Sequence, residues 1–201
     1  NKLENFFFEF KPHSVFHLAA ESHVDRSINN PELFIKTNIL GTFNLLEISK
    51  NYYQQNKFSR RFVFMHISTD EIYGSLAKKN NTKFNEKNNI DPNSPYSASK
   101  ASSDLLVKAW NKTFKLPIII TNCSNNFGPW QFPEKLVPVI IYNALNKTKI
   151  PIYGNGENIR DWIYVDDHCR GIWSALTRGK SGEAYNFGPS ADQNYPVSEL
   201  I

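Results

Sequence analysis

The sequence predicts an α/β protein whose larger part is a doubly wound parallel sheet and whose smaller part is an α+β lobe. Apolar runs of strand length alternate with longer segments of helical periodicity, an order typical of parallel sheets with helices on their faces. Reactive or small side chains follow where three predicted strands end, at Leu18-Ala19-Ala20, Ser68-Thr69-Asp70 and Cys123-Ser124-Asn125. Ligands of such sheets bind outside the carboxyl ends of the strands, so these three segments predict where a site lies.

Residues 1–126 are expected to form the sheet domain, because their apolar segments have the length and composition of buried strands and amphipathic helices. The helix predicted over 31–51 begins at a proline, which suits a first turn. Lys, Asn and Asp are frequent between residues 76 and 94, which indicates an exposed loop. The predicted elements are strand Ser14–Ala20, helix Pro31–Asn51, strand Phe62–Ser68, helix Pro95–Phe114 and strand Pro117–Cys123.

Residues 127–201 are expected to form the smaller lobe, since the strand and helix pattern changes after Gly128. Two short strands surround Gly154-Asn155-Gly156, a turn signal, and the next helix begins with Asp, a residue favoured at helix starts. The predicted elements are helix Glu134–Asn146, strands Ile150–Tyr153 and Ile159–Val165, helix Asp166–Thr177 and strand Ala184–Gly188.

The composition excludes several classes of protein. A hydrophobic content of 40% and an aromatic content of 14% are typical of a globular domain rather than a disordered chain. No apolar run approaches the ~20 residues of a membrane span, and two cysteines are too few for a disulfide framework, so we expect a cytoplasmic protein. The net charge of +4 is compatible with an anionic ligand or with solubility alone; the basic residues are scattered, which argues against a nucleic-acid partner.

Two segments suggest a shared chemistry. Tyr96 and Lys100 are four residues apart on the predicted helix 95–114, so phenol and ammonium share a face, and a nearby cation favours the phenolate. Thr69, Asp70 and Glu71 follow a buried strand and supply a hydroxyl and two carboxyl groups side by side. Adjacent side chains at a strand end point in different directions, which permits separate acid and base roles. These groups together suit redox chemistry coupled to water elimination on a sugar.

Plainer interpretations exist for each of these residues. Thr69 can cap a turn, Asp70 can cap a helix, and the Asp-Glu pair can be a solvated turn or a charge pair at a helix start. Lys100 can be a surface lysine, and Tyr-x-x-x-Lys pairs occur on many helices by chance. Thr69-Asp70-Glu71 follows a predicted strand, and Tyr96 and Lys100 lie at the start of the next predicted helix. The occurrence of both segments together in this order favours the functional interpretation.

At these residues the chain resembles the extended short-chain dehydrogenase/reductase family, and within it the nucleotide-sugar 4,6-dehydratases. The resemblance extends over nearly the whole chain. Thr69-Asp70-Glu71 is its most discriminating motif, since related epimerases and decarboxylases usually lack the acidic pair. The other matching segments are 17–27, 37–42, 96–104, 122–129, 133–136 and 160–165.

The resemblance implies a Rossmann-type fold and a lyase that removes water from dTDP-glucose with bound NAD. By residue match, Tyr96 takes the proton of the sugar C4 hydroxyl, and Lys100 lowers the pKa of Tyr96 and binds the nicotinamide ribose. Thr69 hydrogen-bonds the C4 oxygen, Asp70 acts as acid at the C6 hydroxyl and Glu71 acts as base at C5. His17, in contrast, is expected to be a structural strand histidine.

The resemblance also assigns binding residues. Ala19 and Ala20 leave room for a cofactor near the backbone, although tight packing is the alternative, and the expected NAD-binding set is Leu18, Ala19, Ala20, Thr37, Ser68, Tyr96, Lys100 and Cys123. Arg160 offers a planar fork for phosphate, or else an ion pair with Asp161 or Glu157. The expected substrate-binding set is Ser22, Asn125, Lys135, Leu136, Pro151, Tyr153 and Arg160, with Pro151 and Tyr153 at the thymine ring or in the core.

One feature departs from the family pattern. Family members begin with a strand and a glycine-rich turn that holds the cofactor pyrophosphate, whereas the 201 residues contain no G-x-x-G-x-x-G or G-x-G-x-x-G segment. We therefore expect a chain truncated at its N-terminus and incomplete at its C-terminus. The resemblance further implies a homodimer through the helices 31–51 and 95–114.

Three other functions are compatible with parts of the sequence. An epimerase or decarboxylase of the same family is disfavoured by Asp70-Glu71. A non-catalytic remnant is favoured by the absent glycine-rich turn but disfavoured by the intact Thr69, Tyr96 and Lys100. A basic nucleic-acid binder is disfavoured by the scattered charges.

Overall fold

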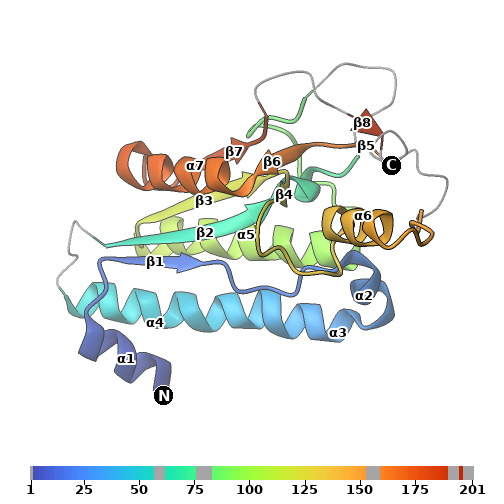
Figure 1. Cartoon of the computed structure of the whole chain (residues 1–201). Coiled ribbons are helices and arrows are strands. Elements are labelled where there is room, and N and C mark those ends of the chain that lie inside the picture. Colours follow the sequence, from blue (N-terminus) through green and yellow to red (C-terminus); the bar gives the residue numbers. More distant parts are fainter. Residues whose placement is uncertain (1, 57–61, 76–82, 153–158, 190–194, 197–201) are drawn as a thin grey trace. The chain divides into compact units, whose positions relative to one another are not determined.

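The structure is a computed structural model, and it describes residues 2–56, 62–75, 83–152, 159–189 and 195–196. The contacts divide the chain into two compact units. Unit 1 comprises Asn1–Asn122 and Trp173–Asn186, and unit 2 comprises Cys123–Ile172 and Phe187–Ile201. Each unit is described by itself below, with the element labels of Figure 1.

A four-stranded sheet forms the centre of unit 1. Strands β1 and β2 are parallel, with Ser14 opposite Val63 and His17 opposite His66. The strand order is β1-β2-β3-β7, so neighbours in the sheet are separated in sequence by helical connections. The predicted α/β fold with a parallel sheet is confirmed. The strands are β1 (Ser14–His17), β2 (Val63–Thr69), β3 (Ile118–Cys123) and β7 (Ala184–Phe187).

Helices α4 and α5 lie side by side and pack on this sheet (Figure 1). Their buried faces meet the apolar side chains of β2 and β3 in one core, which includes Leu46 and Val107 from the helices and Phe64 and Ile120 from the strands. Burying large apolar side chains in this way is the main driving force for the unit. The helical elements are α1 (Lys2–Phe10), α2 (Val24–Asn29), α3 (Pro31–Phe34), η1 (Ile35–Leu40), α4 (Gly41–Gln55) and α5 (Pro95–Phe114).

Helix α5 has the bounds that the sequence predicts. Ser94 caps it: the Ser94 hydroxyl accepts a hydrogen bond from the Ser97 N–H at 3.0 Å, and the Ser97 hydroxyl accepts one from the Ser94 N–H at 3.0 Å. This reciprocal capping box and the proline at the first position fix the start of the helix. Lys115 ends it in the left-handed conformation at φ 59°.

The predicted helix 31–51 forms, but it is not uniform. A π-helical segment, η1, separates α3 from α4, and α4 continues to Gln55. The carbonyl of Asn38 in η1 accepts hydrogen bonds from two buried hydroxyls, Thr42 Oγ1 at 2.6 Å and Ser103 Oγ at 2.6 Å. Side-chain donors thus satisfy a carbonyl at the point where the regular helical ladder is interrupted.

Unit 2 contains two small sheets and a helix with many exposed apolar side chains. Strands β4 (Asn125–Phe127) and β6 (Trp162–Tyr164) are parallel, and β5 (Ile159–Arg160) and β8 (Tyr195–Pro196) are antiparallel. Helix α6 spans Leu136–Leu145, and α7 spans Val165–Arg178 and continues into unit 1.

The predicted strand Ile150–Tyr153 is wrong over its described residues. Residues 150–152 have no strand conformation, Pro151 has no N–H to donate to a ladder, and the Ile152 side chain is 52% exposed. Tyr153 and the Gly154-Asn155-Gly156 turn lie outside the described residues. Two further strand ends differ: the predicted strand 14–20 ends at His17, and the predicted strand 159–165 is interrupted at Asp161.

Among the residues that the structure describes, no helix has both the length and the apolar composition to cross a membrane.

Candidate active site

The Thr69-Asp70-Glu71 segment lies at the carboxyl end of β2. The strand ends at Thr69 in extended conformation, and the 3₁₀ turn η2 (Asp70–Tyr73) follows at once. Thr69 Oγ1 accepts a hydrogen bond from the Glu71 N–H at 3.3 Å and lies 3.4 Å from Asp70 Oδ1. The capping role of Thr69 is therefore real, and it holds the hydroxyl beside the first carboxyl group. Thr69 is buried, whereas Asp70 and Glu71 are half-buried.

Gly74 and Tyr73 fix the end of this turn. Gly74 has φ 85°, and a Cβ there would overlap the carbonyl oxygen of Asp91, so only glycine fits without strain. The Tyr73 hydroxyl donates to Asn186 Oδ1 on β7 at 3.0 Å. Burial raises the pKa of Tyr73 to about 12, so its proton stays in place at neutral pH.

Lys100 is buried beneath the same strand end. Its side chain is 4% exposed, and Nζ donates to the Ile67 carbonyl at 2.8 Å, two residues before Thr69. A surface lysine is thereby excluded. Tyr96 lies one turn earlier on α5 and is half-buried, with its ring edge-on to Phe34 at 6.3 Å. The phenol and the ammonium thus lie one turn apart on the same helix, and the ammonium contacts the end of β2.

Two buried histidines stand near Lys100. Burial first, then the charges of His66 and Lys100, lower the pKa of His17 to about 3. Burial and Lys100 also lower the pKa of His66, against the opposing effect of Asp104. Both rings are therefore neutral at neutral pH. His17 Nε2 is hydrogen-bonded to Thr42 Oγ1 at 2.8 Å, which agrees with the structural role expected for His17.

The segment after β1 is held to α5. Asn38 in η1 accepts from the Glu21 N–H at 2.9 Å and donates to the Glu21 carbonyl at 3.0 Å and to Ser99 Oγ at 2.8 Å. Ser99 lies between Tyr96 and Lys100 on α5. The hydrogen bonds of Asn38 therefore connect the segment after β1, where cofactor-binding residues are predicted, to the helix that carries Tyr96 and Lys100. Of the cofactor-binding set in unit 1, Leu18 and Ala19 are exposed, Ala20 and Thr37 are half-buried, and Ser68 is buried; the nearby Ser22 is exposed.

Unit 2 contains the remaining predicted binding residues. Cys123 is buried, and its sulfur accepts from Asn126 Nδ2 at 3.3 Å, while Asn126 Oδ1 contacts His168 Nδ1 at 2.8 Å. Burial lowers the pKa of His168. Asn125 lies on β4; Asn125, Lys135 and Leu136 are half-buried, Pro151 and Arg160 are exposed, and Tyr153 lies outside the described residues.

Two polar residues of the site region were not singled out from the sequence. Asn122 Nδ2 contacts both Asp104 Oδ2, at 3.0 Å, and the Thr69 carbonyl, at 3.3 Å. Both side chains are 1% exposed. A signal was present: Asn122 interrupts an isoleucine-rich strand, and Asp104 is one helical turn after Lys100, on the same face.

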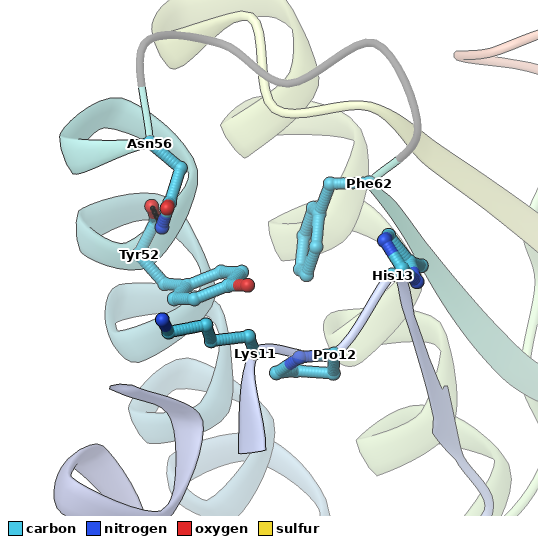
Figure 2. A pocket seen from close by; sticks show the side chains of 6 residues that line it. All are labelled: Lys11, Pro12, His13, Tyr52, Asn56 and Phe62. Atoms are coloured by element: carbon cyan, nitrogen blue, oxygen red, sulfur yellow. Dashed lines mark hydrogen bonds between the residues drawn. The ribbon is translucent and has the colours of Figure 1, made fainter. Parts of the chain in front are cut away.

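A small cavity lies at the opposite ends of β1 and β2. Figure 2 shows its lining, which comes from the residues just before the two strands and from α4. Its volume is about 190 Å³. Parallel-sheet ligands bind at the carboxyl ends instead, so this cavity is separate from the candidate site. It is lined by Lys11, Pro12, His13, Tyr52, Asn56 and Phe62.

Comparison with known proteins identifies the family. The family model described as GDP-mannose 4,6 dehydratase matches residues 1–197. The chain belongs to this family. It is 54% identical over 191 residues to dTDP-glucose 4,6-dehydratase 1 of Escherichia coli, an alignment that covers 90% of the chain and 53% of the relative.

Solved structures agree with the family. DesIV, a dTDP-glucose 4,6-dehydratase of Streptomyces venezuelae solved with NAD and TYD bound, is 42% identical with a TM-score of 0.84, over 93% of this chain and 54% of that one. UDP-glucuronic acid 4-epimerase of Bacillus cereus, solved with UDP-glucuronic acid and NAD, is 28% identical with a TM-score of 0.86, over 100% of this chain and 60% of that one. The chain thus spans about half the length of the relatives that it matches.

Proposed function

We propose that the protein removes water from dTDP-glucose to give dTDP-4-keto-6-deoxyglucose, with NAD as a bound cofactor, and is therefore a lyase. The observation that supports this most is at the end of β2. Thr69, Asp70 and Glu71 lie there side by side, and the buried Lys100 donates a hydrogen bond to the Ile67 carbonyl of the same strand. The named dehydratase relative and the relatives solved with NAD support the same assignment.

The residues at this strand end suit the nicotinamide half of NAD. Lys100 supplies a buried ammonium, Tyr96 a phenol and Thr69 a hydroxyl, while the small side chains of Ala19 and Ala20 leave the backbone accessible. Lys100 and Tyr96 would hold the ribose and nicotinamide end of the cofactor. When bound, NAD supplies the acceptor for the C4 hydride and the donor of the hydride that C6 receives.

Tyr96, Asp70 and Glu71 would carry out the proton transfers. Tyr96 takes the C4 hydroxyl proton while Thr69 donates a hydrogen bond to the C4 oxygen. Glu71 removes the C5 proton, and Asp70 gives a proton to the C6 hydroxyl, which leaves as water. Glu71 then returns its proton to C5. Tyr96 then loses the C4 hydroxyl proton to solvent, and Asp70 takes up a proton from solvent. The sum is loss of one water with no net change of cofactor or enzyme. The short Thr69–Asp70 separation of 3.4 Å supports adjacent roles for these two groups.

The acidic pair favours dehydration over the other activities of the family. The fold alone does not discriminate, because an epimerase structure superposes as well as a dehydratase structure does. An epimerase needs only redox chemistry at C4, whereas elimination also needs an acid at C6 and a base at C5. Asp70 and Glu71 supply both. The same burial of Lys100 disfavours a decayed, non-catalytic chain, since a buried cation is costly to retain without a use.

The two units would bind different ligands. Unit 1 would bind NAD through its sheet, and unit 2 would bind the nucleotide sugar through Asn125, Lys135 and Arg160. We also propose a homodimer through α4 and α5, on which Phe43 and Leu105 are 39% and 54% exposed. The exposed free thiol of Cys169 favours a reducing compartment such as the cytoplasm.

The test is a product analysis. The protein is incubated with NAD and dTDP-glucose, and proton NMR follows the conversion of the C6 hydroxymethyl group into a methyl group. Appearance of the methyl signal in the wild-type reaction, and its loss with Tyr96→Phe, is the expected result. Inversion at C4 without a methyl signal would instead establish an epimerase.

A further inference from the structure

The backbone at the end of β2 is held by side chains from two neighbouring elements. Lys100 Nζ from α5 donates to the Ile67 carbonyl at 2.8 Å, and Asn122 Nδ2 from β3 donates to the Thr69 carbonyl at 3.3 Å. The two carbonyls are alternate ones in the strand. The last residues of β2 are therefore fixed independently of the ladder of the sheet.

Asn122 is itself oriented by Asp104. The amide nitrogen has two N–H donors, and its two contacts within the described residues are Asp104 Oδ2 at 3.0 Å and the Thr69 carbonyl. The other carboxyl oxygen, Oδ1, lies 3.2 Å from His66 Nε2. If Asp104 did not receive the first N–H, the amide could rotate and release the Thr69 carbonyl.

Packing alone does not explain these three polar groups. His66, Asp104 and Asn122 are 0%, 1% and 1% exposed, and a buried carboxyl group costs free energy that apolar side chains of similar size would avoid. His66 contacts Asp104, Asp104 accepts from Asn122, and Asn122 donates to the carbonyl of Thr69. The hydroxyl of Thr69 lies beside Asp70. Asp104 also lies one turn after Lys100, so α5 directs both residues at the same strand.

We propose that Asp104 and Asn122 are positioning residues, which hold the Thr69 carbonyl so that Thr69, Asp70 and Glu71 leave β2 in the orientation needed for catalysis. This inference rests on the proposed function, because it concerns the placement of residues that act in it. Loss of the restraint misplaces reacting groups without removing them, and a displacement of about 1 Å can lower a rate by about 10²-fold.

The test exchanges the two residues. Asn122→Asp breaks the pair, because it removes the amide donor and sets two carboxyl groups against each other. Adding Asp104→Asn in the double variant restores a donor–acceptor pair between the two positions but leaves the Thr69 carbonyl without its amide donor. Thr121→Val is the matched control. Thr121 is the neighbouring buried residue of β3, it is 0% exposed, and its hydroxyl has no hydrogen-bond partner among the residues that the structure describes. Three quantities are measured: the urea midpoint of unfolding, the hydrogen exchange rate of the Glu71 amide, and kcat with KM.

The double variant should regain at least half of the urea midpoint that Asn122→Asp loses. Its Glu71 amide should still exchange about tenfold faster than in wild type, because the Thr69 cap is no longer held. Its kcat should stay about 10²-fold low with KM little changed. Thr121→Val should match wild type in all three measurements.

Recovery of the exchange rate and kcat together with stability in the double variant would overturn the proposal, as would a Glu71 exchange rate in Asn122→Asp equal to that of Thr121→Val. If a single variant does not fold, Asn122→Ser, which removes the amide without adding charge, takes its place with the same expectations. The exchange measurement needs no cofactor or substrate. An inactive wild-type protein would therefore refute the proposed function alone, while the exchange rates would still decide the positioning role.

Discussion

Acid should destabilise the protein through His17. Its pKa is lowered to about 3 in the folded chain, mainly by burial, against 6.5 in the unfolded chain. Between these two values the unfolded state binds more protons than the folded state, so the free energy of unfolding falls as pH falls. The stability is fully present above pH 6.5 and is lost progressively toward pH 3.

The size of the effect follows from the same two pKa values. One such histidine changes the free energy of unfolding by up to about 1.4 kcal/mol per pH unit, and integration from about pH 7.5 to about pH 4.5 gives about 2–3 kcal/mol. His17 is only 6% exposed, so solvent screening takes away little of this.

The assay is urea unfolding of wild type and His17→Gln across this pH range. The variant should lose the 2.8 Å contact with Thr42 and be less stable at neutral pH, but its stability should fall less steeply with acid. His13→Gln is the matched control, because His13 is exposed, and it should keep the wild-type slope. A His17→Gln slope equal to that of wild type would refute the assignment of a neutral, buried His17.

Three further predictions follow. Asp70→Asn should slow water elimination by about 10²–10⁴-fold while C4 oxidation persists, so reduced nicotinamide should accumulate in a single turnover; an unchanged dehydration rate would remove Asp70 from the mechanism. Gly74→Ala should lower the free energy of unfolding by about 1–3 kcal/mol because of its positive φ, measured in urea against Gly41→Ala, where the nearest atom to a new Cβ is 3.8 Å away. Leu105→Glu should convert a dimer into a monomer, as measured by light scattering. Leu145→Glu should not, although Leu145 on α6 is more exposed, at 79% against 54%. A monomeric wild type would contradict the proposed interface.

The sequence was sufficient for the elements whose ends are set locally. Helix α5 matches its predicted bounds because Ser94, Pro95 and the left-handed Lys115 act within one turn of each end. Strands β2 and β3 were also predictable, since nearly all of their residues are buried and each begins with an apolar run. The position of the candidate site followed from a general rule for parallel sheets, and the structure places Thr69 and Lys100 together at that edge.

The features that sequence reasoning missed depend on distant residues. The π-helical segment at Ile35–Leu40 coincides with a hydroxyl from α5, Ser103, bonded to the Asn38 carbonyl, and no local periodicity reports that contact. The strand predicted at Ile150–Tyr153 is absent over residues 150–152, where Pro151 has no N–H to donate to a ladder. The hydrogen bond between Asn122 and Asp104 joins β3 to α5. The sequence indicates it only through polar residues within otherwise apolar segments.

The most direct test of the account follows one hydrogen through the reaction. The protein purified from its source is given dTDP-glucose deuterated at C4, and the product is examined by NMR. The proposed dehydratase should give a 4-keto-6-deoxy product with the deuterium in its C6 methyl group, because oxidation at C4 and reduction at C6 would use the same bound cofactor. A product that keeps deuterium at C4, or no product with a methyl group, would contradict the assignment of a dehydratase.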